Sequence, residues 1–238
     1  MSNIELSVVV LCYRAEEEII PFVEKLKLLL EKLTDNFEIV LVGNYFPGTT
    51  DRTKEIVEEL AKHDSRLKAI TKPKKGMMGW DMLEGLKAAV GEYICVIDGD
   101  GQFPIESVEK CFITIKSQNL DLVKTYRKKR FDGPYRVLIS KTYNFLFQLL
   151  FPSLASKDIN SKPKIIRRVA LNKMQLYSTD WFIDAEIMIN VRRYKMKIAE
   201  FPIQFYDIKR SSFVKIGAVF EFTKNLIVFR IKEFYIKK

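Results

Sequence analysis

The 238-residue chain is poor in the residues that mark several protein classes. It has only three cysteines, Cys12, Cys95 and Cys111, without the two-residue spacing of a zinc or redox motif. An odd number of scattered cysteines predicts neither a disulfide framework nor a zinc site, and it makes the cytosol the expected compartment. With 10 glycines and 8 prolines, the composition excludes a collagen-like or disordered chain.

Long apolar runs are also absent. The run near the N-terminus, residues 8–12, has five residues, whereas a membrane-spanning helix needs about 18 to 20. We therefore expect neither a signal peptide nor a spanning segment. Since 47% of the residues are hydrophobic, the chain can fill a large core, and its length suits one compact domain covering residues 1–238.

Negative charge is scarce in the second half of the chain. Residues 1–120 contain 15 basic and 20 acidic side chains, whereas residues 121–238 contain 25 basic and 10 acidic ones, which gives a net charge of +10 overall. Such a basic half suits an anionic partner, for which nucleic acid, an acidic membrane surface and a phosphorylated substrate are the candidates. No nucleic-acid-reading motif is present, so we expect no nucleic-acid partner.

The hydrophobic pattern predicts an α/β fold, with a mostly parallel central sheet covered by helices on both faces. Strands are expected at residues 4–12, 37–42, 67–70, 92–97, 120–125, 163–168 and 198–205. Helices are expected from near Pro21 and at residues 51–62, 76–90, 104–116, 135–151, 181–194 and 213–235.

Three oxygen-bearing side chains, Asp98, Asp100 and Gln102, follow the expected strand 92–97 at a spacing of two residues. Ligands of open α/β sheets bind at such carboxyl ends of strands. In an extended turn, these side chains can direct three oxygens toward one hard cation, Mg²⁺ or Mn²⁺. A solvated, glycine-bearing turn with acidic side chains is the alternative.

The segment VIDGDGQFP, residues 96–104, resembles the metal motif of the family 2 glycosyltransferases of the GT-A fold. The resemblance covers residues 5–215 and is strongest to the branch of dolichyl-phosphate mannose synthase and its bacterial polyprenyl-phosphate relatives. It implies that Asp98, Asp100 and Gln102 hold the metal ion that bridges a nucleotide-sugar diphosphate, with Asp100 also acting in catalysis. A divalent cation would stabilise the charge of the departing diphosphate.

Two further segments resemble the donor-binding parts of that family. SVVVLCYRAEEE, residues 7–18, is similar to the opening strand and nucleotide-contacting loop, and KKGMMGWDMLEGLKAA, residues 74–89, is similar to the glycine-containing donor-site helix. The resemblance implies that the donor is a UDP- or GDP-linked sugar and that Tyr13 and Lys75 contact its nucleotide.

The chain departs from the family pattern at acidic positions of the donor site. Ala15 stands where the family has an acidic residue, and Glu16 is the candidate replacement. Gly43 and Asn44 stand where the family has an Asp-Asp pair. Asn44 can both donate to and accept from a base or ribose, and a turn asparagine is the alternative interpretation.

Phosphate-binding positions are implied by two basic segments. DLVKTYRKKR, residues 121–130, resembles the family segment whose arginine follows the fifth strand. The resemblance maps Arg127 to a phosphate-facing position and makes it a catalytic candidate, with Arg130 and Arg136 next in line. Guanidinium groups suit bidentate phosphate binding. YDIKRSSFVK more loosely resembles the closing family segment, which makes Arg210 and Ser212 further candidates.

Acidic residues of the second half are candidates for catalysis. Residues 156–168 resemble the acceptor segment with Asp158, and STDWFIDAE resembles a later acidic motif with Asp184 and Glu186. On a helix these last two point about 200° apart, so one of them faces the site, and we select Asp184 as the catalytic residue.

The family resemblance implies an inverting, metal-dependent glycosyltransferase that moves a hexose from a nucleotide-diphosphate sugar to a polyprenyl phosphate, dolichyl or undecaprenyl. An ionised phosphate can attack without a general base. Transfer to a sugar hydroxyl of a cell-surface glycan, with Asp184 as base, is an alternative. A catalytically weakened family member acting as an interaction subunit is another, because Ala15 and Gly43 replace acids.

The domain is expected to have a nucleotide-sugar-binding half, residues 1–125, and an acceptor-side half, residues 126–238. Helices 135–151 and 213–235 combine apolar positions with nearby basic residues. Such helices pack against a core or a partner in a homodimer, or lie on a bilayer. A lipid acceptor would favour peripheral contact with the cytoplasmic face of a membrane.

Overall fold

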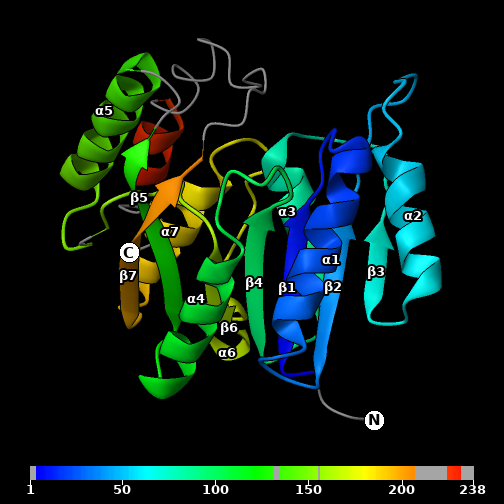
Figure 1. Cartoon of the computed structure of the whole chain (residues 1–238). Coiled ribbons are helices and arrows are strands. Elements are labelled where there is room, and N and C mark those ends of the chain that lie inside the picture. The colour runs from blue at the N-terminus through cyan, green and yellow to red at the C-terminus, as the bar shows by residue number, and fades with distance from the viewer. Residues whose placement is uncertain (1–3, 131–133, 155, 207–223, 232–238) are drawn as a thin grey trace.

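The computed structural model describes residues 4–130, 134–154, 156–206 and 224–231. Its seven-stranded sheet has the strand order β3-β2-β1-β4-β6-β5-β7 (Figure 1). Among the described strands, β6 is the one that runs antiparallel to its neighbours, so the prediction of a mostly parallel sheet is confirmed. The strands are β1 (Leu6–Leu11), β2 (Phe37–Val42), β3 (Leu67–Ile70), β4 (Tyr93–Asp98), β5 (Leu122–Arg130), β6 (Lys164–Arg167) and β7 (Ile198–Phe205).

Helices cover both faces of this sheet, and each face has its own hydrophobic core. One core joins the sheet to α1, α2 and α4, and the other joins it to α3, α5, α6 and α7 (Figure 1). The helices are η1 (Glu16–Glu18), α1 (Ile19–Leu30), α2 (Thr53–His63), α3 (Met78–Ala88), α4 (Glu106–Ser117), α5 (Pro134–Leu150), α6 (Arg168–Leu171) and α7 (Ile183–Arg193).

Strands β1, β2 and β4 form the centre of the parallel part because their sequences are almost entirely apolar. Every residue of β1 and β2 is buried, as expected for strands covered on both faces. Leu11, the last residue of β1, is in register with Val42 and with Asp98. The segments that follow these three strands therefore leave the sheet at one edge.

The second half of the sheet differs from the sequence-based expectation in two ways. Strand β5 continues to Arg130 instead of ending at Thr125, because β7 pairs with it in parallel along its length, with one register shift between Arg127 and Lys129. The expected boundary at residues 125 and 126 therefore lies inside β5. Strand β6 is inserted between β4 and β5, a placement that its sequence could not predict.

Part of the expected terminal helix, residues 224–231, is helical, and most of the remainder lies outside the described residues. It packs on the second core through the buried Leu226, and the Phe229 ring centroid lies 4.8 Å from that of Phe182. The Arg230 guanidinium lies 6.0 Å from the ring of Phe151, just beyond α5. Across the described parts of the chain, every helix is too short or too polar to span a bilayer.

Candidate active site

The turn after β4 contains two glycines that its geometry favours. The Gly99 amide donates a hydrogen bond to the Leu11 carbonyl at 2.9 Å. A Cβ atom on Gly99 would lie 2.7 Å from Cδ1 of Ile19 and 3.2 Å from that carbonyl oxygen. Gly101 has a φ angle of +71°, in the left-handed region that favours glycine. The two glycines thus let the chain turn tightly against β1 and α1, directly beyond Asp98.

Three oxygen-bearing side chains lie on this turn, as the sequence predicts. The backbone amide of Gln102 donates to Oδ1 of Asp100 at 3.0 Å, which fixes the carboxylate over the turn. The side-chain amide nitrogen of Gln102 donates to the Tyr206 carbonyl at 3.4 Å, so the amide oxygen is the atom of that side chain that can bind a cation. The Asp98 side chain is 24% exposed.

The donor set of this turn fits Mg²⁺ or Mn²⁺, because both ions prefer carboxylate and amide oxygens. The residues described by the structure contain no group of three or more His, Cys, Asp and Glu side chains that could hold a metal ion. The candidate site has two carboxylates, and its third protein ligand would be the Gln102 amide oxygen. Phosphate oxygens of a bound substrate would complete the coordination, as is usual for Mg²⁺.

Charged side chains of alternating sign form a row behind Asp98. The Lys162 ammonium lies 3.3 Å from the Asp98 carboxylate and 3.3 Å from that of Asp184. On its other side Asp184 accepts a hydrogen bond from the Lys164 ammonium. The side chains of Lys162, Asp184 and Lys164 are 3%, 1% and 1% exposed. The row thus leads from the core to the metal-candidate turn.

Burial and charge act against each other in this row. Burial raises the pKa of the Asp184 carboxyl, but the adjacent ammonium groups of Lys162 and Lys164 outweigh it and hold that pKa below its ordinary value. Burial lowers the pKa of Lys164 to about 8, although Asp184 opposes the shift. Asp184 is therefore an ionised counter-ion at neutral pH, enclosed between two lysines.

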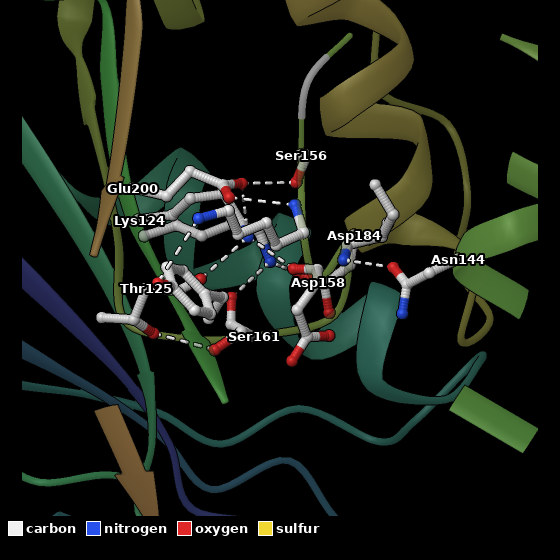
Figure 2. A network of polar contacts seen from close by, with 12 residues as sticks. Lys124, Thr125, Asn144, Ser156, Asp158, Ser161, Asp184 and Glu200 are labelled. Atoms are coloured by element: carbon white, nitrogen blue, oxygen red, sulfur yellow. Dashed lines mark hydrogen bonds and ion pairs between the residues drawn. The ribbon is translucent and has the colours of Figure 1, made fainter. Parts of the chain in front are cut away.

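A second buried network holds the segment 156–162 in place (Figure 2). Arg127 donates from Nε and Nη2 to the Asp158 carboxylate at 2.6 and 2.8 Å. Burial raises the pKa of Asp158, but this guanidinium holds the pKa well below its usual range. The ammonium of Lys124, whose side chain is fully buried, donates to the Asp158 carbonyl and lies 3.5 Å from Glu200.

Further hydrogen bonds join the same segment to the surrounding elements (Figure 2). Glu200 of β7 accepts from the Ser156 hydroxyl at 2.5 Å and from the Lys157 amide at 2.9 Å. Asn144 of α5 accepts from the Ile159 amide at 2.8 Å. Thr125 of β5 lies 2.8 Å from the Ser161 hydroxyl. Segment 156–162 is therefore fixed by β5, β7 and α5 together.

Beyond β2, a lysine that is paired with a carboxylate lies against two aromatic rings. The Lys74 ammonium is 4.3 Å from the centroid of Tyr13 and 5.7 Å from that of Phe46, and it pairs with the Asp81 carboxylate. Burial raises the pKa of Asp81, which Lys74 and Asn44 oppose. Aromatic rings beside a charged pair could hold a nucleobase by stacking and polar contacts.

Asn44 is used inside this cluster. Its amide nitrogen donates to Asp81 at 2.9 Å, its amide oxygen accepts from the Lys72 backbone amide at 2.8 Å, and the residue is 2% exposed. The proposed contact of Asn44 with base or ribose stays a prediction. Asp81, on the same cluster, is a donor-site candidate that the sequence reasoning missed.

Two other nucleotide candidates lie at the surface. The Lys75 ammonium is 5.9 Å from the ring of Trp80, so it is Lys74 rather than Lys75 that the structure brings to Tyr13. Glu16 is exposed, and its backbone amide donates to the Thr53 hydroxyl at 2.9 Å. Their roles in nucleotide binding stay predictions.

The phosphate-binding candidates of the second half have different positions. Arg127 is committed to Asp158, and its guanidinium also lies 5.2 Å from the ring of Phe205. Arg130 ends β5, but its side chain lies outside the described set. Arg210 and Ser212 lie outside the described residues. The assignment of phosphate contacts to these four residues stays a prediction.

Glu186 has a structural environment distinct from that of Asp184. Its carboxylate accepts from the backbone amides of Tyr177 and Ser178 at 3.0 and 2.8 Å. The expectation that the two side chains point apart is confirmed, since only Asp184 joins the row that ends at Asp98. The helix that carries them begins at Ile183 and not at residue 181, because residues 178–180 cap α3 instead.

The buried lysines were the largest omission of the sequence reasoning. Lys124 and Lys164 lie in β5 and β6, and Lys162 immediately precedes β6. The one available signal was the presence of a lysine within an otherwise apolar strand, as in LVKT or KIIR. Lysine is almost never fully buried unless it is paired, so such a lysine indicates a buried carboxylate, but the sequence does not identify it.

The chain is similar in sequence to several known proteins. The sequence model of the family described as "Glycosyl transferase family 2" matches residues 7–184. An undecaprenyl-phosphate 4-deoxy-4-formamido-L-arabinose transferase of Pectobacterium atrosepticum is 29% identical over 144 residues, which are 60% of this chain and 43% of that protein. A dolichyl-phosphate beta-glucosyltransferase of Trichomonas vaginalis is 25% identical over 240 residues, 95% of this chain and 73% of that protein.

Solved structures share the fold. Glucosyl-3-phosphoglycerate synthase from Mycobacterium tuberculosis, crystallised with Mn²⁺, UDP and phosphoglyceric acid, matches with a TM-score of 0.73 and 17% identity, over 96% of this chain and 79% of that chain. Mannosyl-3-phosphoglycerate synthase from Rubrobacter xylanophilus matches with a TM-score of 0.72 and 16% identity, over 96% and 73%.

The extent of these matches limits what they establish. The chain spans less than half the length of the bacterial arabinose transferases that it matches. Likeness to the solved structures concerns the GT-A fold, because the identities are low. The family match, however, covers most of the chain and includes the turn after β4 and the row of charges up to Asp184. The chain therefore belongs to glycosyl transferase family 2.

Proposed function

We propose that this protein is an inverting glycosyltransferase that moves a hexose from a nucleotide-diphosphate sugar to a polyprenyl phosphate. The observation that carries the proposal is the turn after β4, which presents Asp98, Asp100 and Gln102 at the carboxyl edge of a parallel sheet. Family membership supports the transferase chemistry. The relatives' names, which include undecaprenyl-phosphate and dolichyl-phosphate transferases, support the lipid acceptor.

The turn residues would act on the leaving group. Asp98, Asp100 and the amide oxygen of Gln102 would hold Mg²⁺ or Mn²⁺, which supplies positive charge to the departing diphosphate. The hydrogen bond from the Gln102 amide fixes Asp100 before substrate binds, so little reorganisation is needed when the sugar leaves. Tyr13, Lys74 and the buried Asp81 line the adjacent candidate base site.

The environment of Asp184 favours a phosphate acceptor over a sugar hydroxyl. A hydroxyl nucleophile needs a general base within reach of its proton, whereas Asp184 is 1% exposed and enclosed by two lysines. An ionised phosphate attacks the anomeric carbon without losing a proton. The basic side chains between residues 121 and 173, 13 against three acidic ones, would attract such an anion.

Membrane contact is part of the proposal because the acceptor is a lipid. Three large apolar side chains on α5, Leu138, Phe145 and Leu149, are 62%, 65% and 65% exposed. The neighbouring helix 224–231 adds Ile227 and Ile231, which are about half exposed. Exposed apolar side chains beside basic ones suit peripheral binding at an anionic membrane face.

The proposal is tested by a donor screen with radiolabelled UDP- and GDP-sugars, Mn²⁺ and undecaprenyl or dolichyl phosphate. Label that enters the organic phase only with polyprenyl phosphate would support the assignment. The anomeric configuration of the product, compared with that of the donor, would report inversion. Label that enters water-soluble glycan instead would support a hydroxyl acceptor. If calorimetry detects no binding of any donor, the chain acts as a non-catalytic interaction subunit.

A further inference from the structure

The Lys162 ammonium occupies an unusual position for a buried lysine. It reaches the Asp98 carboxylate from the segment preceding β6, 64 residues away in sequence. Its Nζ atom lies 3.3 Å from Asp98, from Asp184 and from the sulfur of Met78. The Lys162 side chain is 3% exposed and that of Asp98 is 24% exposed. A fixed positive charge therefore lies directly behind the first carboxylate of the metal-candidate turn.

We propose that Lys162 supplies a protein-borne positive charge to the diphosphate subsite and shares the Asp98 carboxylate with the divalent cation. This inference rests on the proposed function and identifies a further residue of its donor site. Before donor binds, Asp98 divides its negative charge between the ammonium and the metal ion. A bound diphosphate would then balance the positive charges of the Lys162 ammonium and of the divalent cation.

A purely structural role for Lys162 does not explain the arrangement. Asp184 already has a buried counter-ion in Lys164, with which it forms a direct hydrogen bond. Lys164 is itself fixed by a second hydrogen bond, at 2.8 Å, to the Ser161 carbonyl. A second lysine would therefore be redundant if Asp184 were its only partner. The contact with Asp98 is the one that connects Lys162 to the surface.

The surroundings of Lys162 allow little movement of its backbone. The Thr125 hydroxyl hydrogen-bonds the Lys162 carbonyl oxygen, and it lies 2.8 Å from the Ser161 hydroxyl. Asp158, four residues earlier, is held by Arg127 and Lys124. The ammonium is therefore pre-positioned, and only the end of the side chain needs to shift toward a bound diphosphate. Preorganised charge of this kind is effective because it needs no rearrangement during the reaction.

The charges predict how metal and anion affinities depend on Lys162. Two cations that share one carboxylate repel each other, so removal of the ammonium should strengthen Mn²⁺ binding to the substrate-free protein. The same removal should weaken diphosphate binding, most strongly when no metal ion is present. Inorganic pyrophosphate is the suitable probe because it contains the diphosphate without a base or sugar.

The test compares the wild-type protein with Lys162→Met, which keeps most of the side-chain volume. Calorimetry should show Mn²⁺ binding to the substrate-free variant about 5- to 10-fold tighter, within the usual range of coupling between two bound ligands. Pyrophosphate affinity in EDTA should fall at least about 10-fold, and in saturating Mn²⁺ it should fall less. Lys162→Arg should retain most of the affinity in EDTA, because it keeps the charge.

Lys157→Met is the matched control, since Lys157 belongs to the same basic segment but is exposed. It should change neither Mn²⁺ nor pyrophosphate affinity by more than about twofold. Thermal melting of each variant reports whether it is folded, and Lys162→Gln, which also removes the charge, takes the place of Lys162→Met if that variant melts early. Unchanged Mn²⁺ affinity together with unchanged pyrophosphate affinity in EDTA, in folded Lys162→Met, would overturn the assignment.

Failure of this inference differs from failure of the proposed function. Donor turnover by wild type with unaltered ligand binding by Lys162→Met would remove Lys162 from the subsite and leave the transferase assignment intact. Absence of turnover with every donor would contradict the transferase assignment, while the Mn²⁺ and pyrophosphate titrations would still decide the role of Lys162.

Discussion

At the scale of residues, the candidate site consists of charges whose partners are mostly within the protein. Asp158 is paired with Arg127, Asp184 with two lysines, and Asp81 with Lys74. Asp98 is the carboxylate that connects this buried system to solvent. Most of these groups therefore position others, and the partly exposed turn after β4 is where substrate chemistry is expected.

Replacement of Asp100 by asparagine should impair metal binding and turnover together. The substitution removes a charged ligand but keeps the shape of the side chain. We expect Mn²⁺ affinity to fall by at least the roughly 10- to 100-fold that loss of an outer-shell partner causes, and turnover with the active donor to fall at least as much. Calorimetry and product assay measure the two effects. Asp35→Asn, at an exposed position, is the control, and wild-type behaviour of Asp100→Asn would contradict the metal assignment.

Replacement of Asp158 by asparagine should destabilise the fold in a pH-dependent way. The substitution removes the charged partner of a buried ion pair, and we expect a loss of about 3 kcal/mol at pH 7. Because Arg127 depresses the pKa of Asp158 in the folded state, the wild-type advantage is complete above the ordinary aspartate pKa and declines below it. At pH 3 the difference should be about 1 kcal/mol smaller.

Urea unfolding of wild type and Asp158→Asn at pH 7 and pH 3 measures this difference. Asp35→Asn provides the matched control for a general change in net charge. A difference in unfolding free energy that is equal at both pH values would show that the Asp158 carboxylate is not selectively stabilised in its ionised form.

At the scale of elements, Gly79 explains how residues 178–180 pack against the start of α3. The backbone amides of Met77 and Gly79 donate to the carbonyls of Thr179 and Asp180 at 2.7 and 2.9 Å. Glu186 holds residues 177 and 178 from the other side. The motif that resembles a donor-site helix is thus also the docking site of segment 178–180.

Gly79→Ala should weaken the packing of α3 against residues 178–180. A Cβ atom at this position would clash with the carbonyl oxygens of Ser178 and Asp180, and such overpacking typically costs about 1 to 3 kcal/mol. Urea unfolding should report a loss in this range, together with weaker pyrophosphate binding as α3 shifts. Lys87→Ala, on the exposed surface of the same helix, should stay within about 0.5 kcal/mol of wild type. A neutral Gly79→Ala would contradict the close packing.

At the scale of the whole molecule, the excess of positive charge and much of the exposed apolar surface lie in the second half of the chain. The basic residues that give the net charge of +10 lie mainly beyond residue 120, and so do α5 and helix 224–231 with their exposed apolar side chains. Under the proposed function, we therefore expect α5 and helix 224–231 to make the contacts with a lipid acceptor.

Vesicle flotation tests this arrangement. Protein should float with vesicles that contain anionic lipid, and binding should weaken with salt because of screening. The triple change Leu138→Ser, Phe145→Ser and Leu149→Ser should reduce binding at least about 10-fold. The matched triple change of Leu28, Val90 and Ile113 to serine also alters exposed apolar side chains and should leave binding unchanged. Equal loss in both triples, or no wild-type binding at low salt, would contradict membrane contact through α5.

The sequence by itself determined the local features of this protein. Apolar periodicity predicted the bounds of β2, β3 and β7 as observed. Strand β2 is buried throughout and its residues are nearly all apolar, as burial on both faces requires. The spacing of Asp98, Asp100 and Gln102 predicted a metal-binding turn, since alternate side chains of an extended turn can point toward the same cation. The charged end of β5 was missed because pairing with β7, and not its own pattern, stabilises it as a strand.

Only the tertiary structure decided which distant side chains meet. The insertion of β6 between β4 and β5 brings Lys162 to Asp98 and Lys164 to Asp184, and the path of residues 71–77 brings Lys74 instead of Lys75 to Tyr13. Sequence patterns report burial and periodicity, which are local, whereas these contacts depend on strand order. A buried lysine must find a carboxylate, and the fold alone determines which one it finds.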